Sequence, residues 1–209
     1  MYAVLYFLLR SGLHKEVLLY LEQHQHAFDQ DQAGFTDALK RYIENNLSLP
    51  IESRRRVQAI FYNDLKHQTE TEDPFKIILF KIIGRCDLSH RSVSSIIQTT
   101  EDYIWLQLML ISEDVSSSAT FDVEEDYRLV DLQTLMRRYG AEHFSKNGSG
   151  NIVHYAEVFL LTAQFTEAVQ FLLKVQGLFV DAVHFAIALF YYGLLDVSSE
   201  SSFESKIEK

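Results

Sequence analysis

Hydrophobic positions recur with a helical period along most of the chain. Between Phe75 and Ile83 apolar side chains stand three, four, seven and eight residues apart, the spacing of one face of an α-helix. Asp73 and Pro74 precede them, an N-cap acceptor followed by proline at the first helical position. We predict a helix that ends at Gly84. Further apolar residues widen the apolar face of this helix, so we expect other helices to pack against it on more than one side.

A second clear helix start lies at Thr99, three residues before Asp102, the spacing of an N-terminal cap. Trp105 in this segment is interpreted as a core anchor. With the same reasoning, helices are predicted over residues 2–11, 14–27, 34–46, 51–68, 90–98, 99–111, 125–143, 151–163, 166–176 and 178–193.

Two segments lack this period. Residues 112–123 are Ser-rich, acidic and aperiodic, so a mobile surface loop is expected there. From residue 197 the composition becomes Ser, Glu and Lys, which is typical of disorder. The predicted organisation is a helical segment over 1–196 with a mobile loop at 112–123, followed by a disordered tail at 197–209.

A weak internal repeat indicates how these helices are arranged. Tyr6 to Leu21 aligns without a gap to Val158 to Leu173, with five identical residues, and both read as a helix, a tight turn and a second helix. Ile78 to Val93 repeats the outline. Helical pairs that cannot cover their own apolar faces must stack, so the predicted fold is all-α, an irregular α-solenoid of stacked hairpins. A compact helical bundle is the alternative.

Composition agrees with a helical protein and limits its partners. Gly and Pro together number only ten (8 and 2), where average usage would give roughly 25. The formal charge of −10 repels phosphate backbones, so nucleic acid is not expected as a direct partner. The one basic run, Arg54 to Arg56, is interpreted as the solvated face of a helix. The single cysteine, Cys86, is interpreted as a structural thiol.

Two apolar stretches are considered as membrane or export segments and rejected. Met1 to Leu9 has no basic region before it and Arg10 directly after it, unlike a signal peptide. Leu178 to Leu195 contains Asp181 and His184, which are disfavoured inside a bilayer. Both are predicted to be buried helices, and no transmembrane segment is expected.

A search for catalytic or metal chemistry yields no site. His24, His26, Asp29 and Asp31 form the densest group of potential ligands, but alternate positions on a helix diverge. His184, between apolar residues, is interpreted as a hydrogen-bonded core histidine. The acidic run Glu124 to Asp126 is interpreted as a helix N-terminus. No catalytic, cofactor-binding or metal-binding residue is therefore assigned, no cofactor is expected, and an enzyme with a helical fold is the least favoured class.

Five blocks of the sequence form an ordered set. The main blocks are DPFKIILFKIIGRCDL (Asp73 to Leu88) and TTEDYIWLQLMLI (Thr99 to Ile111). The further blocks are RYGAEHF (Arg138 to Phe144), VFLLTAQFTEAVQFLL (Val158 to Leu173) and DAVHFAIALFYYGLL (Asp181 to Leu195). In this order the blocks resemble the nucleoporin-interacting component family, the large inner-ring scaffold nucleoporins of the nuclear pore complex.

The resemblance implies a middle portion of a longer coat-protein-like α-solenoid, either as a fragment or as a truncated gene product. It also implies a non-enzymatic scaffold at the nuclear envelope that contributes to pore assembly and nucleocytoplasmic transport. Implied partners are a membrane-associated linker nucleoporin and the inner-ring scaffold and channel nucleoporins, although no motif locates the partner-binding residues. An α-solenoid peptide-binding or coat-type adaptor outside the pore stays open as the alternative function.

Overall fold

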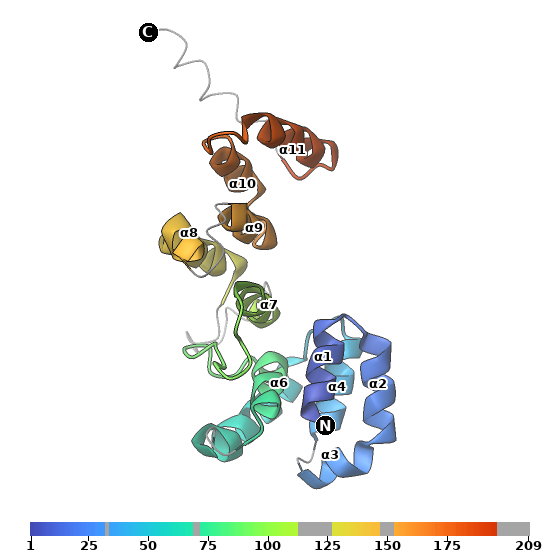
Figure 1. The fold of residues 1–209 in the computed structure, drawn as a ribbon. Helices are drawn as coiled ribbons and strands as arrows, with labels where there is room; N and C mark the ends of the chain where they lie inside the picture. The colour runs from blue at the N-terminus through green and yellow to red at the C-terminus, as the bar shows by residue number, and fades with distance from the viewer. Residues whose placement is uncertain (32–33, 69–71, 113–126, 147–152, 196–209) are drawn as a thin grey trace, which may run out of the picture. The chain divides into compact units, whose positions relative to one another are not determined.

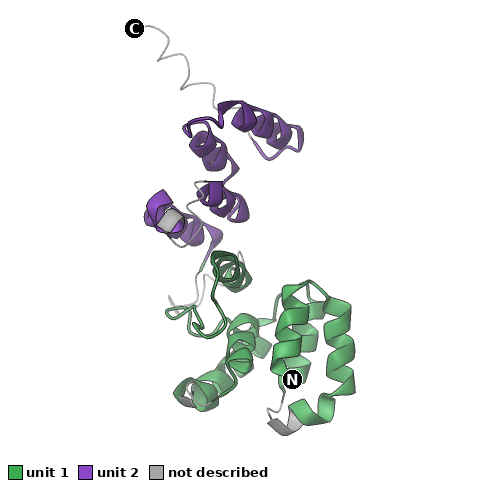
Figure 2. Ribbon diagram, in the orientation of Figure 1, with its two compact units in different colours: residues 1–127 green, residues 128–209 purple. Residues whose placement is uncertain are grey.

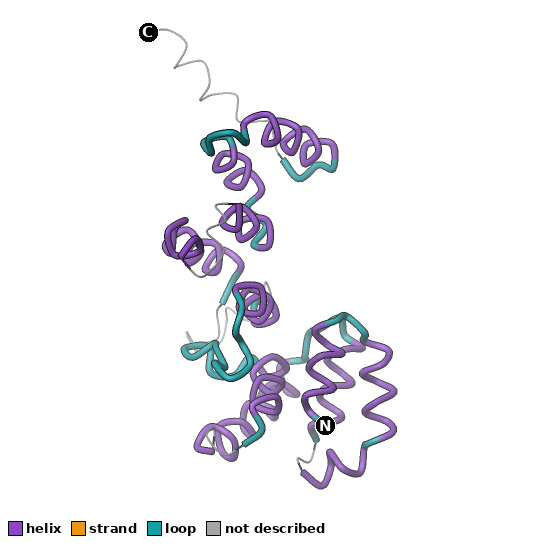
Figure 3. Tube along the Cα trace, in the orientation of Figure 1, coloured by secondary structure: helices purple, strands orange, loops and turns teal. Residues whose placement is uncertain are grey.

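The computed structural model describes residues 1–31, 34–68, 72–112, 127–146 and 153–195, and within these ranges every regular element is a helix (Figure 3). The chain divides into two compact units, Met1–Tyr127 and Arg128–Lys209 (Figure 2). Residues 113–126 and 196–209 lie outside the described residues, and they hold most of the expected mobile loop and all of the expected tail.

The first unit contains seven α-helices within its described residues (Figure 1). They are α1 (Tyr2–Arg10), α2 (His14–Gln23), α3 (Gln25–Asp31), α4 (Phe35–Glu44), α5 (Ile51–Ile60), α6 (Pro74–Gly84) and α7 (Thr100–Leu110). Helix α5 continues into a π-helical turn at Phe61–Leu65 and a 3₁₀ turn at Lys66–Gln68. The helix expected over 14–27 is divided at His24, where the backbone leaves the helical conformation (φ −118°, ψ 16°).

Helix α6 lies at the centre of this unit and packs against α1, α4, α5 and α7. Every residue from Lys76 to Gly84 is buried, so the expected neighbours on several sides are confirmed. The predicted cap is also confirmed, because the Phe75 amide donates to Asp73 Oδ1 at 2.9 Å. At the start of α7, Thr99 Oγ1 likewise accepts from the Asp102 amide at 3.1 Å.

Gly84 allows α5 and α6 to approach closely. A Cβ atom at this position would lie 2.8 Å from Val57 Cγ1 and 2.6 Å from Cys86 Sγ, well inside van der Waals contact. Helix α6 ends at Gly84, as predicted, and the next residue, Arg85, takes the left-handed conformation (φ 51°) that a glycine commonly adopts after a helix.

The helix predicted over 90–98 is wrong, and with it the third hairpin, over 78–93. Residues 85–99 form turns and an irregular connection between α6 and α7. Side chains satisfy the backbone of this segment, as Arg91 Nη1 donates to the Leu88 carbonyl at 2.8 Å and Lys81 Nζ donates to the His90 carbonyl. These long side chains bind carbonyls that a helix would pair internally.

The second unit contains α8 (Leu129–Lys146), α9 (Val153–Leu161), α10 (Phe165–Leu172) and α11 (Phe179–Tyr191) among its described residues. These helices pack in chain order, α8 against α9, α9 against α10 and α10 against α11. Gly140 interrupts α8 with φ 71° and ψ 169°, so α8 consists of two helical pieces. The hairpins predicted at Tyr6 to Leu21 and Val158 to Leu173 are confirmed as α1–α2 and α9–α10.

Burial differs from expectation at two apolar helices. In α1 the inner face is buried, but Phe7 is 58% exposed. In α11 only Ala182 and Leu189 are buried, so the prediction that Leu178 to Leu195 is a buried helix is wrong. The other described residues of α11 include several large apolar side chains that are more than half exposed.

Candidate interaction surfaces

The four potential metal ligands near the end of α2 lie only partly within the described residues. His24 stacks on Tyr20 with ring centroids 4.2 Å apart, and its Nδ1 lies 3.0 Å from the Tyr20 carbonyl oxygen. The side chains of Asp29 and Asp31 lie outside the described residues. Among the residues described, no group of three or more His, Cys, Asp or Glu side chains could hold a metal ion.

The structure agrees with some of the other residue interpretations made from the sequence and contradicts that of His184. His184 is exposed on α11, so its interpretation as a core histidine is wrong. Cys86 is fully buried behind the end of α6, as expected for a structural thiol. Trp105 is half-buried and packs edge-on against Tyr6, with ring centroids 5.6 Å apart. The acidic run 124–126 lies outside the described residues.

The three consecutive arginines of α5 do not share one environment. Arg55 and Arg56 are exposed, as expected for a solvated face. Arg54 is only 7% exposed, which corrects the interpretation of all three as solvated. Its Nη2 donates to the Leu49 carbonyl at 3.2 Å and holds the guanidinium against the turn that precedes α5.

A buried ion pair holds the connection that follows α6. Lys81 Nζ lies 3.0 Å from Asp87 Oδ2, and the two side chains are only 6% and 12% exposed. Asp87 has a left-handed backbone (φ 54°), and its amide donates to the Tyr62 hydroxyl at 3.0 Å. Asp87 therefore links three parts of the first unit: α6, the π-helical turn after α5, and the irregular connection between α6 and α7.

The ionisation of Asp87 follows from these contacts. Burial opposes the charged carboxylate, but the hydrogen bond and charge of Lys81, with hydrogen bonds from His90 and Ser89, outweigh it and lower the pKa of Asp87 below its ordinary value of 3.8. The connection is thus held by a carboxylate that stays ionised at neutral pH.

A polar network joins the same connection to α7 and to Tyr127. Gln107 is fully buried, and its Oε1 accepts from Arg91 Nε at 2.9 Å and from the Tyr127 hydroxyl at 3.0 Å. The Arg91 guanidinium lies 4.1 Å from the centroid of the Tyr127 ring, a favourable cation–π distance. Because Gln107 binds both Arg91 and Tyr127, the network fixes the irregular segment without a helix.

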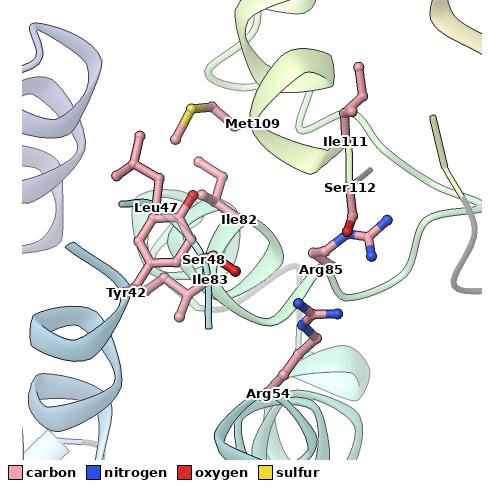
Figure 4. A pocket seen from close by; sticks show the side chains of 10 residues that line it. All are labelled: Tyr42, Leu47, Ser48, Arg54, Ile82, Ile83, Arg85, Met109, Ile111 and Ser112. Carbon is pink, nitrogen blue, oxygen red and sulfur yellow. The ribbon is translucent and has the colours of Figure 1, made fainter. Parts of the chain in front are cut away.

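A pocket of about 180 Å³ opens in the first unit beside this connection (Figure 4). It lies where the turn after α4, the buried Arg54, the end of α6 and the end of α7 meet. The polar side chains that line it are Tyr42, Ser48, Arg54, Arg85 and Ser112. The apolar ones are Leu47, Ile82, Ile83, Met109 and Ile111.

The second unit presents an apolar face on α11. Large apolar side chains that are more than half exposed gather on this helix and just after it, namely Phe179, Val180, Ile187, Phe190, Tyr191 and Tyr192. Exposed apolar faces of this size are typical of interaction surfaces. Within the described residues, no helix has the length and hydropathy needed to cross a membrane.

Helices that pack in chain order, each against the next, place the second unit in the class of α-solenoids. Comparison with known proteins identifies the family. A family model described as Nup93/Nic96 matches residues 1–208. The chain therefore belongs to the Nup93/Nic96 family.

Similar proteins support this assignment along nearly the whole chain. The Meiotically up-regulated gene 87 protein of Schizosaccharomyces pombe is 37% identical over 202 residues, which are 96% of this chain and 23% of that protein. Nucleoporin NIC96 of Chaetomium thermophilum is 35% identical over 204 residues, 93% of this chain and 18% of that protein. Nuclear pore complex protein Nup93 of Danio rerio is 31% identical over 204 residues, 96% of this chain and 23% of that protein.

The fold likewise matches a solved member of the family. The crystal structure of Chaetomium thermophilum Nic96 SOL superposes with a TM-score of 0.78 at 31% identity, over 93% of this chain and 27% of that one. The chain thus spans about a quarter or less of the length of these relatives. Sequence reasoning found the family blocks, but it missed the pocket, whose lining comes from four separate parts of the chain.

Proposed function

We propose that this chain is a structural segment of the nuclear pore complex scaffold and that it acts by docking other nucleoporins at the nuclear envelope. The observation that carries the proposal is the family match over residues 1–208. Relatives named nucleoporin NIC96 and nuclear pore complex protein Nup93 align with more than nine-tenths of the chain. In this role the segment contributes to pore assembly and nucleocytoplasmic transport as architecture rather than as a catalyst.

The physical basis of the role is a rigid support for exposed binding surfaces. In the first unit α6 is packed on several sides, and paired polar side chains fix the connection after it. Rigid elements position surface residues with little entropy left to lose when a partner binds. Linker, inner-ring and channel nucleoporins are the partners proposed, through apolar anchors that enter grooves of the scaffold.

The uncovered face of α11 supports a further part of the proposal. Solenoid helices bury their apolar faces against the next helical pair, and the matched relatives are several times longer than this chain. In a full-length family member, the residues Ile187 and Phe190, which are 62% and 57% exposed here, would pack against a following helix.

A segment exchange tests the proposed function. The matched region of Saccharomyces cerevisiae nucleoporin NIC96, which is 29% identical to this chain over 206 residues, is replaced by the present segment in a fluorescently tagged protein. A nuclear-rim signal is expected.

The matched control carries Leu79→Asp in the exchanged segment. Leu79 is fully buried in α6, so a charge there prevents the first unit from folding and the rim signal should weaken or disappear. A diffuse signal from the unmodified exchange, at normal protein level, would contradict the scaffold function.

A further inference from the structure

The connection between α6 and α7 places four serines at the surface, namely Ser89, Ser92, Ser94 and Ser95. Among the contacts of the described residues, Ser89 is the one of the four whose hydroxyl reaches the buried ion pair, because it donates to Asp87 Oδ1 at 3.2 Å. The Ser89 side chain is therefore open to solvent and at the same time in contact with a group that holds the connection in place.

The two oxygen atoms of the Asp87 carboxylate have different neighbours. Oδ2 lies 3.0 Å from Lys81 Nζ, and these two side chains are 12% and 6% exposed. Oδ1 accepts from Ser89 and lies 3.3 Å from His90 Nδ1, and the His90 side chain is 81% exposed. Chemical modification of the Ser89 oxygen therefore acts at the exposed side of a buried ion pair.

The backbone around Ser89 suits an enzyme that modifies a peptide segment. Ser89 lies in a turn, and residues 91–93 after it form neither helix nor turn. A protein kinase binds the residues on both sides of a serine as extended chain, which an irregular surface segment supplies without the unwinding of a helix. Ser89 thus combines exposure, an irregular backbone and contact with a buried charge.

A phosphate group on Ser89 would act against the ion pair. It replaces a hydroxyl donor by about −1.5 to −2 charges at neutral pH, beside an Asp87 carboxylate that is itself ionised. A phosphate next to a carboxylate is disruptive because like charges repel. His90 is exposed, so its attraction for the phosphate is weak, and Lys81 already binds Asp87 Oδ2 and the His90 carbonyl. Repulsion is therefore the larger effect.

We propose that Ser89 is a phosphorylation site and that its phosphate releases the connection between α6 and α7. A protein kinase transfers the terminal phosphoryl group of ATP to Ser89 Oγ. The bond between that phosphorus and the ADP oxygen breaks, the bond to Oγ forms, and the hydroxyl proton passes to solvent. The phosphate then drives Asp87 away from Lys81, and hydrolysis by a phosphatase, which releases inorganic phosphate, restores the ion pair. This switch goes beyond the scaffold function and does not rest on it.

Site-specific incorporation of phosphoserine into the full chain tests the effect. The ammonium protons of Lys81 give an NMR signal while a buried ion pair protects them from rapid exchange with water. Ser89→phosphoserine should abolish this signal. It should also speed hydrogen exchange of the His90 amide, which donates to the Asp87 carbonyl at 3.0 Å, by about tenfold or more, because the turn opens when its anchor is lost.

Three matched variants locate the cause. Ser92→phosphoserine adds the same charge three residues further along the connection and should leave both signals unchanged. Ser89→Ala removes the hydroxyl without adding charge, so the Lys81 signal should persist. In an Asp87→Asn background the repelling carboxylate is absent, and Ser89→phosphoserine should speed exchange of the His90 amide by less than about twofold.

Mass spectrometry tests whether the site is modified. The full chain is expressed in eukaryotic cells and purified with phosphatases inhibited. A peptide that carries phosphate on Ser89 is expected, and treatment with a protein phosphatase should remove the phosphate. If this peptide is detected in its unmodified form alone, the assignment of Ser89 as a phosphorylation site is overturned.

The structural outcomes are equally decisive. A Lys81 ammonium signal that survives Ser89→phosphoserine, or equal losses from phosphoserine at Ser89 and at Ser92, would overturn the switch. An undiminished effect in the Asp87→Asn background would overturn its electrostatic cause. If the phosphoserine protein fails to fold, Ser89→Asp adds a single charge at the same place, and unchanged signals in that variant overturn the proposal.

Discussion

Helices α6 and α11 are both strongly apolar, but the structure uses them in opposite ways. Helix α6 contains PFKIILFKIIG and buries nine consecutive residues, even including Lys76 and Lys81. Helix α11 contains FVDAVHFAIALFY and buries only Ala182 and Leu189. The difference lies in the neighbours, because α6 packs against four helices, whereas the main neighbour of α11 among the described elements is α10.

This contrast shows what apolar composition does and does not determine. Composition and period favour a helix at both places, because each sequence forms a helix readily once one face is covered. Burial of the remaining faces depends on other segments of chain. A one-dimensional stack leaves its last face uncovered, while a helix at the centre of a cluster has no uncovered face.

The largest expected effect comes from replacing a phenylalanine by alanine in α6, compared with the same replacement in α11. Phe80 is fully buried in α6 and stacks on Phe35 with ring centroids 5.1 Å apart. Phe80→Ala should lower the free energy of unfolding of the first unit by about 3–5 kcal/mol, from lost burial and the cavity left behind. Urea unfolding followed by the fluorescence of Trp105, the single tryptophan, measures this unit.

Phe190→Ala in α11 is the matched control. Phe190 is 57% exposed, so the change should alter the free energy of unfolding of the second unit, followed by far-UV circular dichroism, by no more than about 0.5 kcal/mol. Comparable losses at Phe80 and Phe190 would show that α11 is covered in solution and would remove the distinction between the helices.

The second expected effect contrasts a buried ion pair in the first unit with an exposed one in the second. Asp87→Asn removes the partner of Lys81, whose side chain is only 6% exposed. An unpaired buried charge lowers the free energy of unfolding by about 3 kcal/mol. Glu167→Gln breaks the pair with Arg137, in which both side chains are more than 40% exposed, and should change stability by less than about 1 kcal/mol. Urea unfolding measures both.

The pH dependence of the first unit should follow from the same carboxylate. The folded state lowers the pKa of Asp87 below 3.8, so the unfolded chain binds this proton first as the solution is acidified. The contribution of Asp87 is complete above the unfolded pKa and is lost as the pH falls through the folded one.

Urea midpoints of the first unit, recorded through Trp105 fluorescence from about pH 6 to about pH 3, should therefore decline less steeply in Asp87→Asn than in the unmodified protein. Parallel declines would show that Asp87 does not hold the connection in its ionised form.

Local signals account for what could be predicted from the sequence. The Asp73–Pro74 start of α6 was predictable because both the cap and the stripe are encoded within a few residues. Residues 90–98 carry a short helical pattern of their own, but Lys81 and Arg91 bind the backbone of this region. These side-chain hydrogen bonds override the weak helical pattern of residues 90–98. The sequence of the segment alone does not reveal them.

The pocket illustrates the same limit for function. Arg54, Arg55 and Arg56 are identical in sequence terms, and only the turn before α5 buries the first of them. Arg85 belongs to a block that marks the family, but it lines the same pocket as Arg54 only because α5 packs against α6. The spacing of the two residues along the chain does not predict this.

The smallest expected effect concerns the turns of the two confirmed hairpins. The α1–α2 turn places Gly12 in the left-handed region (φ 72°), whereas the α9–α10 turn places Ala163 there (φ 56°). Because a Cβ disfavours this conformation, Ala163→Gly should stabilise the α9–α10 hairpin by about 0.5–1 kcal/mol. Ala156→Gly, the same change inside α9, should destabilise it by about 1 kcal/mol or more. Hydrogen exchange of the α9 and α10 amides measures both, and effects of the same sign would contradict a strained turn in the second unit.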